Sequence, residues 1–432
     1  MDVSTLQLRI AELSSRYAGE ALFSLNHFIT PELLEASYRG LRKKSSAGVD
    51  ELSMKSYEQG LSDRLIRLEE LAKSGKYFAP PVKRVYIPKA GGKRRPIGIP
   101  TVEDKVLQGA VKLILEPIYE EEFYDFSYGF RRGRSPHQAL KRLRDGIMHL
   151  GGCYVIDLDL SNYFGTIQHG ELRKILDQRV RDGVLRRLID KWLQAGIMEN
   201  GELRYEDEGT PQGGVISPLL SNIYLHEVLD KWFAEQVSCL LSGPSFMVRY
   251  ADDAVLCFSN KADALRVLKT LPKRLSKYGL SMNLSKTKVV RFYYDQDRDS
   301  DEGGRTFDFL GFTHHWGKSR GGKWVVRKRT AQDRYNARLT EINLWCKRNR
   351  HTSLANQHKT LCLKLRGHYN YYGVVGNRMQ LSRYQHKVEE IWRKWLSRRG
   401  GKKRMSWGKF LRNIKPRYPL PYPKPSTKLK LT

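Results

Sequence analysis

The chain contains 432 residues, 40% of them hydrophobic, and carries a formal net charge of +31. This length allows two or three domains with a sizeable core, and the excess positive charge favours nucleic acid as a partner. No apolar segment resembles a signal peptide or approaches the ~20 residues that span a membrane, so we expect no membrane partner and a cytoplasmic, nucleic-acid-associated protein. The five cysteines are scattered without a C-x-x-C pair, which argues against a disulfide framework or a zinc site.

The first 80 residues are mostly helical in pattern. Candidate helices cover 6–22, 31–41 and 58–73, the last with leucines at helical spacing. A Gly-containing loop follows, in which Lys89, Lys93, Arg94 and Arg95 crowd together between two β-like segments. Such a loop can fold its cationic groups over a triphosphate, although a solvated basic turn has the same composition.

A β-rich run from Tyr154 to Leu160 carries carboxylates at alternate positions. The alternation predicts that Asp157 and Asp159 lie on one face of a strand. We interpret Asp157 as a solvated charge at the end of this strand. Asp159 is a candidate metal ligand.

The segment 209–218 surrounds Gln212 with three glycines and two prolines and leads into an expected helix over 219–225. Glycine lets the backbone approach a ligand closely, and proline fixes a bend. The segment is a candidate nucleotide-binding loop, with an ordinary connecting loop as the alternative.

The string Tyr250-Ala251-Asp252-Asp253 lies between two apolar runs of β-forming residues. The flanks predict a hairpin with both carboxylates at its turn. Two-metal phosphoryl transfer needs carboxylates from separate strands around two ions about 3.5–4 Å apart. Asp159, Asp252 and Asp253 could supply them, whereas an ordinary Asp-Asp turn is the alternative for the hairpin pair.

The last quarter of the chain is strongly basic. Residues 318–432 hold 31 Lys and Arg against 4 Asp and Glu, a net charge of +27, whereas residues 1–317 have a net charge of +4. Three helices are expected over 331–348, 353–372 and 381–395, with tyrosines that either stack on RNA or pack in a core. A Pro-rich tail from 416 to 425 is expected to be extended and mobile. The acidic stretch 293–304 is expected to be a hairpin loop, because no calcium-binding pattern is completed.

Seven blocks stand in the order found in one protein family. They are Ile87-Pro88-Lys89 through Pro100-Thr101, Ser127-Tyr128-Gly129-Phe130 through Ser135, the Asp159 block, Gly209-Thr210-Pro211-Gln212-Gly213 through Leu219, the Tyr250 hairpin, Gly279-Leu280-Ser281-Met282-Asn283 with Lys286-Thr287-Lys288, and Phe309-Leu310-Gly311-Phe312. On these blocks the chain resembles reverse transcriptases of the group II intron maturase family. The resemblance is to members without the C-terminal His/Cys-rich endonuclease, since no such ligand cluster occurs here.

The resemblance implies a role for individual residues. Asp159, Asp252 and Asp253 would be catalytic and would hold two Mg²⁺ ions, with the backbone carbonyl of Leu160 as a further ligand and Mn²⁺ as a substitute. Lys89, Arg95 and Gln212 would contact the incoming dNTP. Phe164 would exclude a 2′-hydroxyl, unless it is an ordinary core aromatic. Gly165 stands where the family often has Asp, and we expect a more flexible turn there.

The implied fold is α+β, a right-hand polymerase with fingers and a palm built on an antiparallel sheet, followed by an α-helical thumb known as maturase domain X. We expect an N-terminal extension and the start of the fingers over 1–80, and fingers over 81–150. The palm would cover 151–317, with a fingers-like segment near 170–215. The thumb would cover 318–400 and the basic tail 401–432.

The implied activity is RNA-directed DNA synthesis from dNTPs onto a primer 3′-hydroxyl. The expected partners are an RNA template or intron RNA and a DNA primer or target DNA, and intron binding would assist splicing and mobility. Two alternatives stay open. In the first, the chain is a reverse transcriptase without an intron that acts in phage defence or DNA repair. In the second, it is mainly an RNA-binding splicing maturase. The oligomeric state is not predicted.

Overall fold

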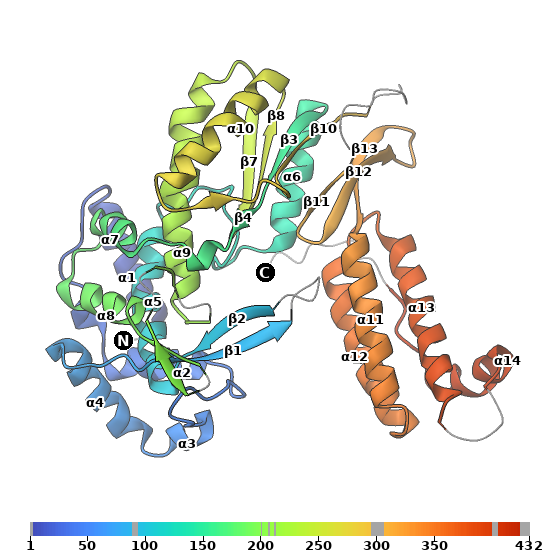
Figure 1. Ribbon diagram of the computed structural model, residues 1–432, viewed down its shortest axis with the longest axis horizontal. Helices are drawn as coiled ribbons and strands as arrows, with labels where there is room; N and C mark the ends of the chain where they lie inside the picture. The colour runs from blue at the N-terminus through green and yellow to red at the C-terminus, as the bar shows by residue number, and fades with distance from the viewer. Residues whose placement is uncertain are drawn as a thin grey trace. The chain divides into compact units, whose positions relative to one another are not determined.

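The structure is a computed structural model that describes residues 3–88, 94–199, 201–205, 208–210, 213–294, 306–399 and 405–423. The chain forms two compact units, and each is built from two separate stretches of sequence (Figure 1). Unit 1 comprises Met1–Ala139 and Leu158–Lys288, and unit 2 comprises Leu140–Asp157 and Val289–Thr432. No helix among the described residues is long and apolar enough to cross a membrane.

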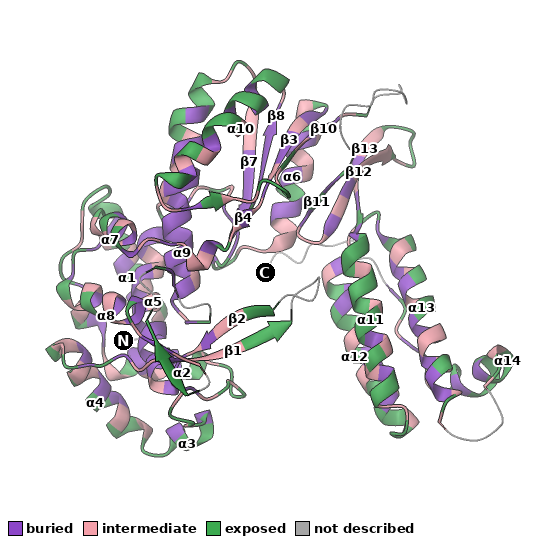
Figure 2. Cartoon of the chain, viewed as in Figure 1, coloured by how far each residue is buried: buried purple, intermediate pink, exposed green. Residues whose placement is uncertain are grey.

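Helix α5 (Val102–Glu120) is the central helix of unit 1. Its N-cap Thr101 accepts a hydrogen bond from the backbone N–H of Asp104, and its apolar positions are completely buried along most of its length (Figure 2). Such an all-round apolar helix needs partners on several sides. Helices α1 (Val3–Arg16), α2 (Pro31–Gly40) and α3 (Met54–Glu58) pack on it, while α4 (Leu61–Ser74) packs on α8 (Gly183–Leu193).

A four-stranded sheet projects from this helical core. Its strand order is β2 (Arg94–Ile99), β1 (Val82–Pro88), β5 (Ile197–Glu199) and β6 (Glu202–Arg204). Strands β1 and β2 pair antiparallel, and they are exposed at the end that carries Arg94 and Arg95 but more buried at the opposite end (Figure 2). The sheet therefore holds basic residues on a ribbon that reaches into solvent.

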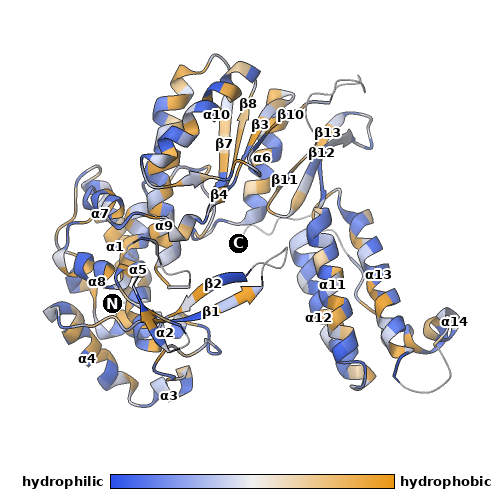
Figure 3. Ribbon diagram, in the orientation of Figure 1, coloured by the Kyte–Doolittle hydropathy of each residue, from blue (hydrophilic) through white to orange (hydrophobic). Residues whose placement is uncertain are grey.

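The second stretch of unit 1 contains the predicted hairpin. Helix α9 (Ser217–Leu225) continues into a π-helical segment, η4 (His226–Val237), and the hairpin β7 (Ser245–Tyr250) and β8 (Asp253–Phe258) follows. Helix α10 (Lys261–Ser276) packs on β8 and η4, and the short strand β4 (Leu160–Ser161) pairs with β9 (Ser281–Met282). Helix α7 (His169–Asp177) lies against α9. The hairpin strands are strongly apolar, as expected for buried strands (Figure 3).

Unit 2 combines strands with a set of basic helices. It contains α6 (Pro136–Leu150) from Leu140 onward, the paired strands β3 (Cys153–Leu158) and β10 (Lys288–Phe292), and an antiparallel sheet of β11 (Phe307–Phe309), β12 (Phe312–Lys318) and β13 (Trp324–Thr330). Helices α11 (Gln332–Arg348), α12 (Leu354–Tyr372) and α13 (Arg378–Leu396) follow, and their surfaces are largely hydrophilic (Figure 3). The predicted α+β class is confirmed as a mixed chain with antiparallel sheets and a helical C-terminal region.

Several predicted boundaries are wrong for local reasons. The first helix ends at Arg16 rather than at residue 22, because the chain turns there and Gly19 has φ +79°. Gly60, at φ +67°, separates α3 from α4 within the helix predicted over 58–73. The strand predicted over 154–160 is interrupted at Asp159, which lies between β3 and β4.

A short helical segment precedes the Pro-rich tail. Trp407–Lys409 (α14) and Phe410–Ile414 (η6) are helical, and Phe410 packs edge-on against Trp392. Within the tail, the carbonyl oxygen of Pro419 lies 2.9 Å from the Nε2 of His358 on α12. Leu420 is buried. Residues 419–423 have no regular secondary structure, and the mobility of the tail stays a prediction.

Candidate active site

The two aspartates of the Tyr250 string lie at a tight hairpin turn, as predicted. Tyr250 pairs with Asp253, so Ala251 and Asp252 form the turn between β7 and β8. Ala251 has φ +56°, a left-handed conformation that costs a residue with a Cβ roughly 1–2 kcal/mol. Asp253 is exposed and Asp252 is half-buried. The turn holds its two carboxylates at the surface at the cost of local strain, which the surroundings must offset.

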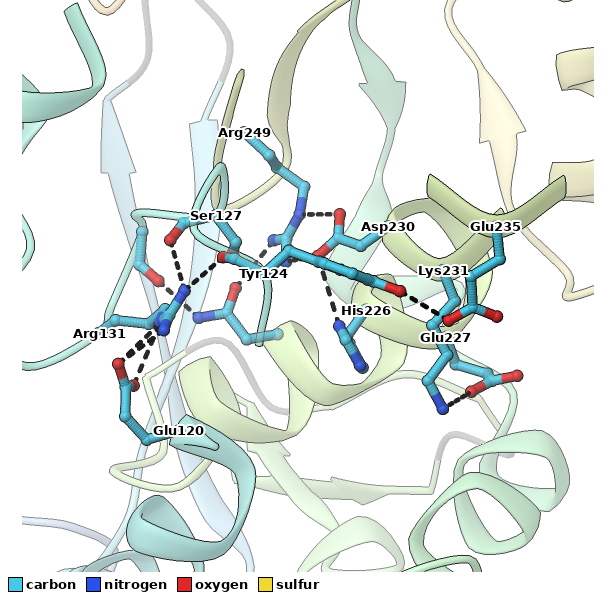
Figure 4. A network of polar contacts seen from close by, with 12 residues as sticks. Glu120, Tyr124, Ser127, Arg131, His226, Glu227, Asp230, Lys231, Glu235 and Arg249 are labelled. Atoms are coloured by element: carbon cyan, nitrogen blue, oxygen red, sulfur yellow. Dashed lines mark hydrogen bonds and ion pairs between the residues drawn. The ribbon is translucent and has the colours of Figure 1, made fainter. Parts of the chain in front are cut away.

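The completely buried side chain of Arg249 stabilises this strained turn (Figure 4). Its Nη1 donates to the carbonyl oxygen of Ala251 at 3.0 Å and to Asn222 Oδ1 at 3.0 Å. Its Nε and Nη2 donate to the two carboxylate oxygens of Asp230 on η4, at 2.7 and 2.5 Å. This bidentate geometry gives the guanidinium one orientation, and the Ala251 carbonyl is therefore held in one place.

The negative charge of Asp230 compensates the buried positive charge of Arg249. Burial would raise the pKa of the Asp230 carboxyl, but Arg249 and His226 outweigh it, so the pKa lies below its usual value. Asp230 therefore stays ionised in the interior. The sequence analysis did not predict this pair. An arginine directly after the apolar residues Phe246-Met247-Val248, within an expected buried strand, is a signal that a buried partner must exist.

The block from Ser127 to Phe130 lies directly on the hairpin. Arg249 N donates to Phe126 O at 2.8 Å, and Tyr128 N donates to Arg249 O at 2.9 Å. A Cβ at Gly129 would lie 2.1 Å from the backbone nitrogen of Ala251, so only glycine fits there. Arg131 secures the block by donating to the carbonyl oxygens of Tyr124 and Ser127 and by pairing with Glu120 (Figure 4).

Asp159 is held by the block that follows Gly279. Asn283 Nδ2 donates to Asp159 Oδ2 at 2.9 Å, and Lys286 Nζ lies 3.2 and 3.1 Å from the two carboxylate oxygens. The backbone of Asn283 also donates to Asp159 O at 2.8 Å. Asn283 and Lys286 were recognised only as part of a family block, and the structure gives them a contact with the candidate metal ligand.

Tyr163 connects the segment after Asp159 with helix α9. Its hydroxyl donates to Ser221 O at 2.6 Å in a fully buried setting. Burial raises the pKa of Tyr163, and the nearby negative charge of Asp252 raises it further.

The candidate nucleotide contacts are described only in part. Lys89, Lys93 and Gln212 lie outside the described residues. Arg95 is exposed on β2 opposite Ile87, and Phe164 is half-buried in the turn Tyr163–Gly165. A Cβ at Gly213, which has φ +123°, would lie 2.3 Å from Gly98 O. Gly213, which follows Gln212 in the sequence, is thus in contact with the strand that carries Arg95.

The space beside Gly165 is taken by the end of an exposed side chain. A Cβ there would lie 2.5 Å from the side-chain Nδ2 of Asn162, which itself has φ +45°. Because the Asn162 side chain can turn into solvent, the structure does not require glycine at this position.

The three aspartates have the chemistry of a magnesium site. Carboxylate oxygens are the ligands that Mg²⁺ prefers, and the Asp159 side chain is one-third exposed. Within the described part of the chain, no group of three or more His, Cys, Asp or Glu side chains is arranged to hold a metal ion, and the Lys286 ammonium neutralises Asp159. Metal binding by these aspartates and by the Leu160 carbonyl stays a prediction.

Comparison with known proteins gives consistent matches. Residues 87–314 match the family described as reverse transcriptase (RNA-dependent DNA polymerase). Protein YkfC of Escherichia coli is 34% identical over 325 residues, which are 67% of this chain and 85% of that protein. Group II intron-encoded protein LtrA of Lactococcus lactis is 37% identical over 227 residues, which are 52% of this chain and 37% of LtrA. An uncharacterized 91 kDa protein in the cob intron of Schizosaccharomyces pombe is 25% identical over 74% of this chain and 47% of its own length.

Proposed function

Because the chain belongs to the reverse transcriptase (RNA-dependent DNA polymerase) family, we propose that it copies RNA into DNA, with dNTPs as substrates and a primer 3′-hydroxyl as the nucleophile. The expected enzyme class, RNA-directed DNA polymerase, and the predicted resemblance to group II intron-encoded proteins are confirmed by the family match and by LtrA. The observation that carries the proposal is the strained Ala251-Asp252 turn, which a buried arginine holds at the surface.

Asp159, Asp252 and Asp253 are the proposed catalytic residues. They would hold two Mg²⁺ ions, or Mn²⁺ in substitution, together with the Leu160 carbonyl. When bound, such ions lower the pKa of an attacking hydroxyl and neutralise charge on the leaving pyrophosphate. When a metal ion binds Asp159, the Lys286 side chain would move away or keep a bond to one carboxylate oxygen. The reason is that its ammonium lies on the side of the carboxylate where a cation would bind.

The nucleotide would bind between β2 and the Gln212 loop. Arg95 would contact the triphosphate together with Lys89, since guanidinium and ammonium groups pair with phosphate oxygens. Gln212 would contact the incoming nucleotide. Phe164 would pack against its sugar and exclude a 2′-hydroxyl.

In terms of domains, we propose that the sheet of β1 and β2 belongs to the fingers over 81–150 and the hairpin to the palm over 151–317. The helices α11 to α13 would form the thumb over 318–400. Their basic surface would bind an RNA template, intron RNA or a primer duplex. The names of LtrA and of the cob intron protein favour an additional role in intron splicing and mobility. The cytoplasmic location stays a prediction.

Primer extension tests the proposal directly. The wild-type chain should extend a DNA primer on an RNA template with dNTPs and Mg²⁺, and Asp252→Ala should reduce extension to background. Asp63→Ala, which removes an exposed carboxylate from α4, is the matched control and should retain activity. Inactivity of the wild type on RNA templates would overturn the assignment. Incorporation of rNTPs as efficient as that of dNTPs would overturn the role of Phe164.

A splicing assay separates the two roles that the family combines. If Asp252→Ala still promotes splicing of a cognate precursor RNA while extension is lost, RNA binding and polymerisation are independent functions of this chain. Loss of both would show that splicing needs an intact active site.

A further inference from the structure

Two segments of unit 1 that flank the proposed nucleotide site are bound to each other through their backbones. Thr210 N donates to Phe164 O at 2.8 Å, and Gly209 N donates to Ile167 O at 2.9 Å. A Cβ at Gly209, which has φ +92°, would lie 3.0 Å from Phe164 O, so no side chain fits between them. The turn that carries Phe164 and the beginning of the Gln212 loop therefore form one connected structure.

His169 adds a side-chain bond to this contact. It is the first residue of α7 and is 7% exposed, and its Nε2 lies 2.6 Å from the carbonyl oxygen of Gly209. A carbonyl oxygen only accepts, so Nε2 carries the proton and donates it. Without this donor the Gly209 carbonyl would lose its partner in a buried place, and the loop could recover hydrogen bonding only by moving.

The other end of the Gln212 loop is held by a second buried side chain. Gln108 on α5 is 4% exposed, and its Oε1 accepts from Val215 N at 2.8 Å. Its Nε2 donates to Asp104 Oδ2 at 3.0 Å, and because a carboxylate only accepts, Asp104 determines which end of the amide faces Val215. In the sequence, Gln212 thus lies between two anchored positions, Thr210 and Val215.

We propose that His169 is a positioning residue that fixes Gly209 and Thr210, which precede Gln212 in the sequence, relative to Phe164 and so determines how strongly the enzyme prefers dNTPs over rNTPs. The inference rests on the proposed function. The physical reason is that an enzyme can discriminate between the two sugars only if the contact to the sugar, from Phe164, keeps a fixed distance from the other nucleotide contact, from Gln212. Among the described residues, three kinds of contact hold the two segments together. They are the backbone bonds to Phe164 and Ile167, the bridge between Gln168 and Glu208, and the bond from His169. Small displacements of a positioning group are known to have large kinetic effects.

Three variants of the full-length chain test this role in steady-state primer extension. His169→Phe keeps a ring but removes the donor, and it should raise KM for dTTP about tenfold, with a smaller change in kcat, and lower the preference for dTTP over UTP by a similar factor. His169→Gln places an amide N–H near the position of Nε2 and should restore both values to near wild type. Gln108→Met, which releases the opposite end of the loop, should give the same pattern as His169→Phe.

The control variant is Tyr38→Phe. Tyr38 is also buried in unit 1 and donates from its hydroxyl to a carbonyl oxygen, that of Met54, at 3.0 Å. It should lower the melting temperature about as much as His169→Phe without changing KM for dTTP or sugar preference.

Each outcome has a defined meaning. Unchanged KM and sugar preference in both His169→Phe and Gln108→Met, in an enzyme whose wild type extends primers, would overturn the inference alone. A failure of His169→Gln to restore the wild-type values would also overturn it, because the hydrogen bond would not be what matters. If the wild type incorporates no dNTP on an RNA template, the proposed function fails and the inference fails with it.

Discussion

Arg249 explains how a surface turn can depend on a buried charge. An ion pair removed from water is costly to assemble, and replacing both partners by apolar groups is often neutral for stability. Stability is therefore a weak reason for this pair to be present. The bond from Arg249 to the Ala251 carbonyl offers another reason, since it holds the left-handed residue that precedes the two aspartates.

Substitutions in this pair should separate stability from activity. Arg249→Met leaves Asp230 in the interior without its arginine partner, and we expect a loss of about 3–5 kcal/mol in the free energy of unfolding, measured with urea. The double variant Arg249→Met/Asp230→Leu should recover most of that loss but should still extend primers poorly, because nothing holds Ala251. Arg39→Met, in an exposed pair with Glu35, should cost only about 0.3–0.5 kcal/mol.

A double variant with wild-type primer extension would show that Arg249 acts only through stability. A double variant as unstable as Arg249→Met would instead show that the loss of stability does not come from the buried charge of Asp230 without its arginine.

At the level of residues, the sequence predicted the carboxylates better than their supports. Asp252 and Asp253 were placed at a hairpin turn because apolar runs of β-forming residues flank them, and the structure confirms that turn. Asp230 was not predicted, because it is 19 residues away from Arg249 and only the fold brings the two together. The hydrogen bond from Asn283 to Asp159, across a separation of 124 residues, was not predicted for the same reason.

At the level of elements, the sheet of unit 2 contains a histidine that its surroundings keep neutral. His314 on β12 is completely buried and stacks on Phe307, with ring centroids 4.8 Å apart. Burial, with smaller effects of Lys328 and His315, lowers its pKa to about 3. The unfolded chain binds a proton at His314 below about pH 6.5, whereas the folded chain does so only near pH 3.

Unit 2 should therefore lose stability in mild acid. Above about pH 6.5 both states are neutral at His314 and no penalty exists, but as the pH falls the unfolded state gains protons that the folded state does not bind. At pH 5 the difference amounts to about 2 kcal/mol for a pKa that is lowered to about 3. His314→Phe keeps the stacking on Phe307 and should remove this dependence, so its melting temperature should change less between pH 7.5 and pH 5.

His351→Phe, in the exposed turn between α11 and α12, is the matched control and should keep the acid sensitivity of the wild type. Equal sensitivity of His314→Phe and wild type would mean that His314 does not titrate with unfolding.

The bounds of helices were predicted well where a single pattern of residues close in sequence determines them. The helices α11, α12 and α13 begin and end within three residues of their predicted bounds, because apolar spacing and the Ser353 N-cap are local signals. The interruption at Asp159 was not predicted. It arises because Leu160 pairs with Met282, more than a hundred residues further on, instead of continuing β3.

At the level of the whole molecule, charge is concentrated in one part of the chain. Residues 318–432 carry a net charge of +27 and include all three helices α11, α12 and α13. Several tyrosines there pack in the interior, including Tyr369, Tyr372 and Tyr384. The exposed surface of these helices therefore offers cations more than aromatic rings, which favours contacts with phosphates over base stacking.

This distribution predicts that RNA affinity depends steeply on salt and that the dependence comes from the C-terminal helices. Six to ten phosphate contacts would reduce affinity by about 10³- to 10⁵-fold between 50 and 200 mM salt. Arg366→Gln/Arg383→Gln removes two exposed cations from α12 and α13, and the slope of log K against log salt should become smaller by about 0.9 for each lost contact. Lys269→Gln/Lys277→Gln removes the same charge from the α10 region of unit 1 and should leave the slope near that of the wild type. Fluorescence anisotropy of a labelled RNA hairpin measures both, and an equal change in the two double variants would show that RNA binding responds to net charge rather than to the surface of these helices.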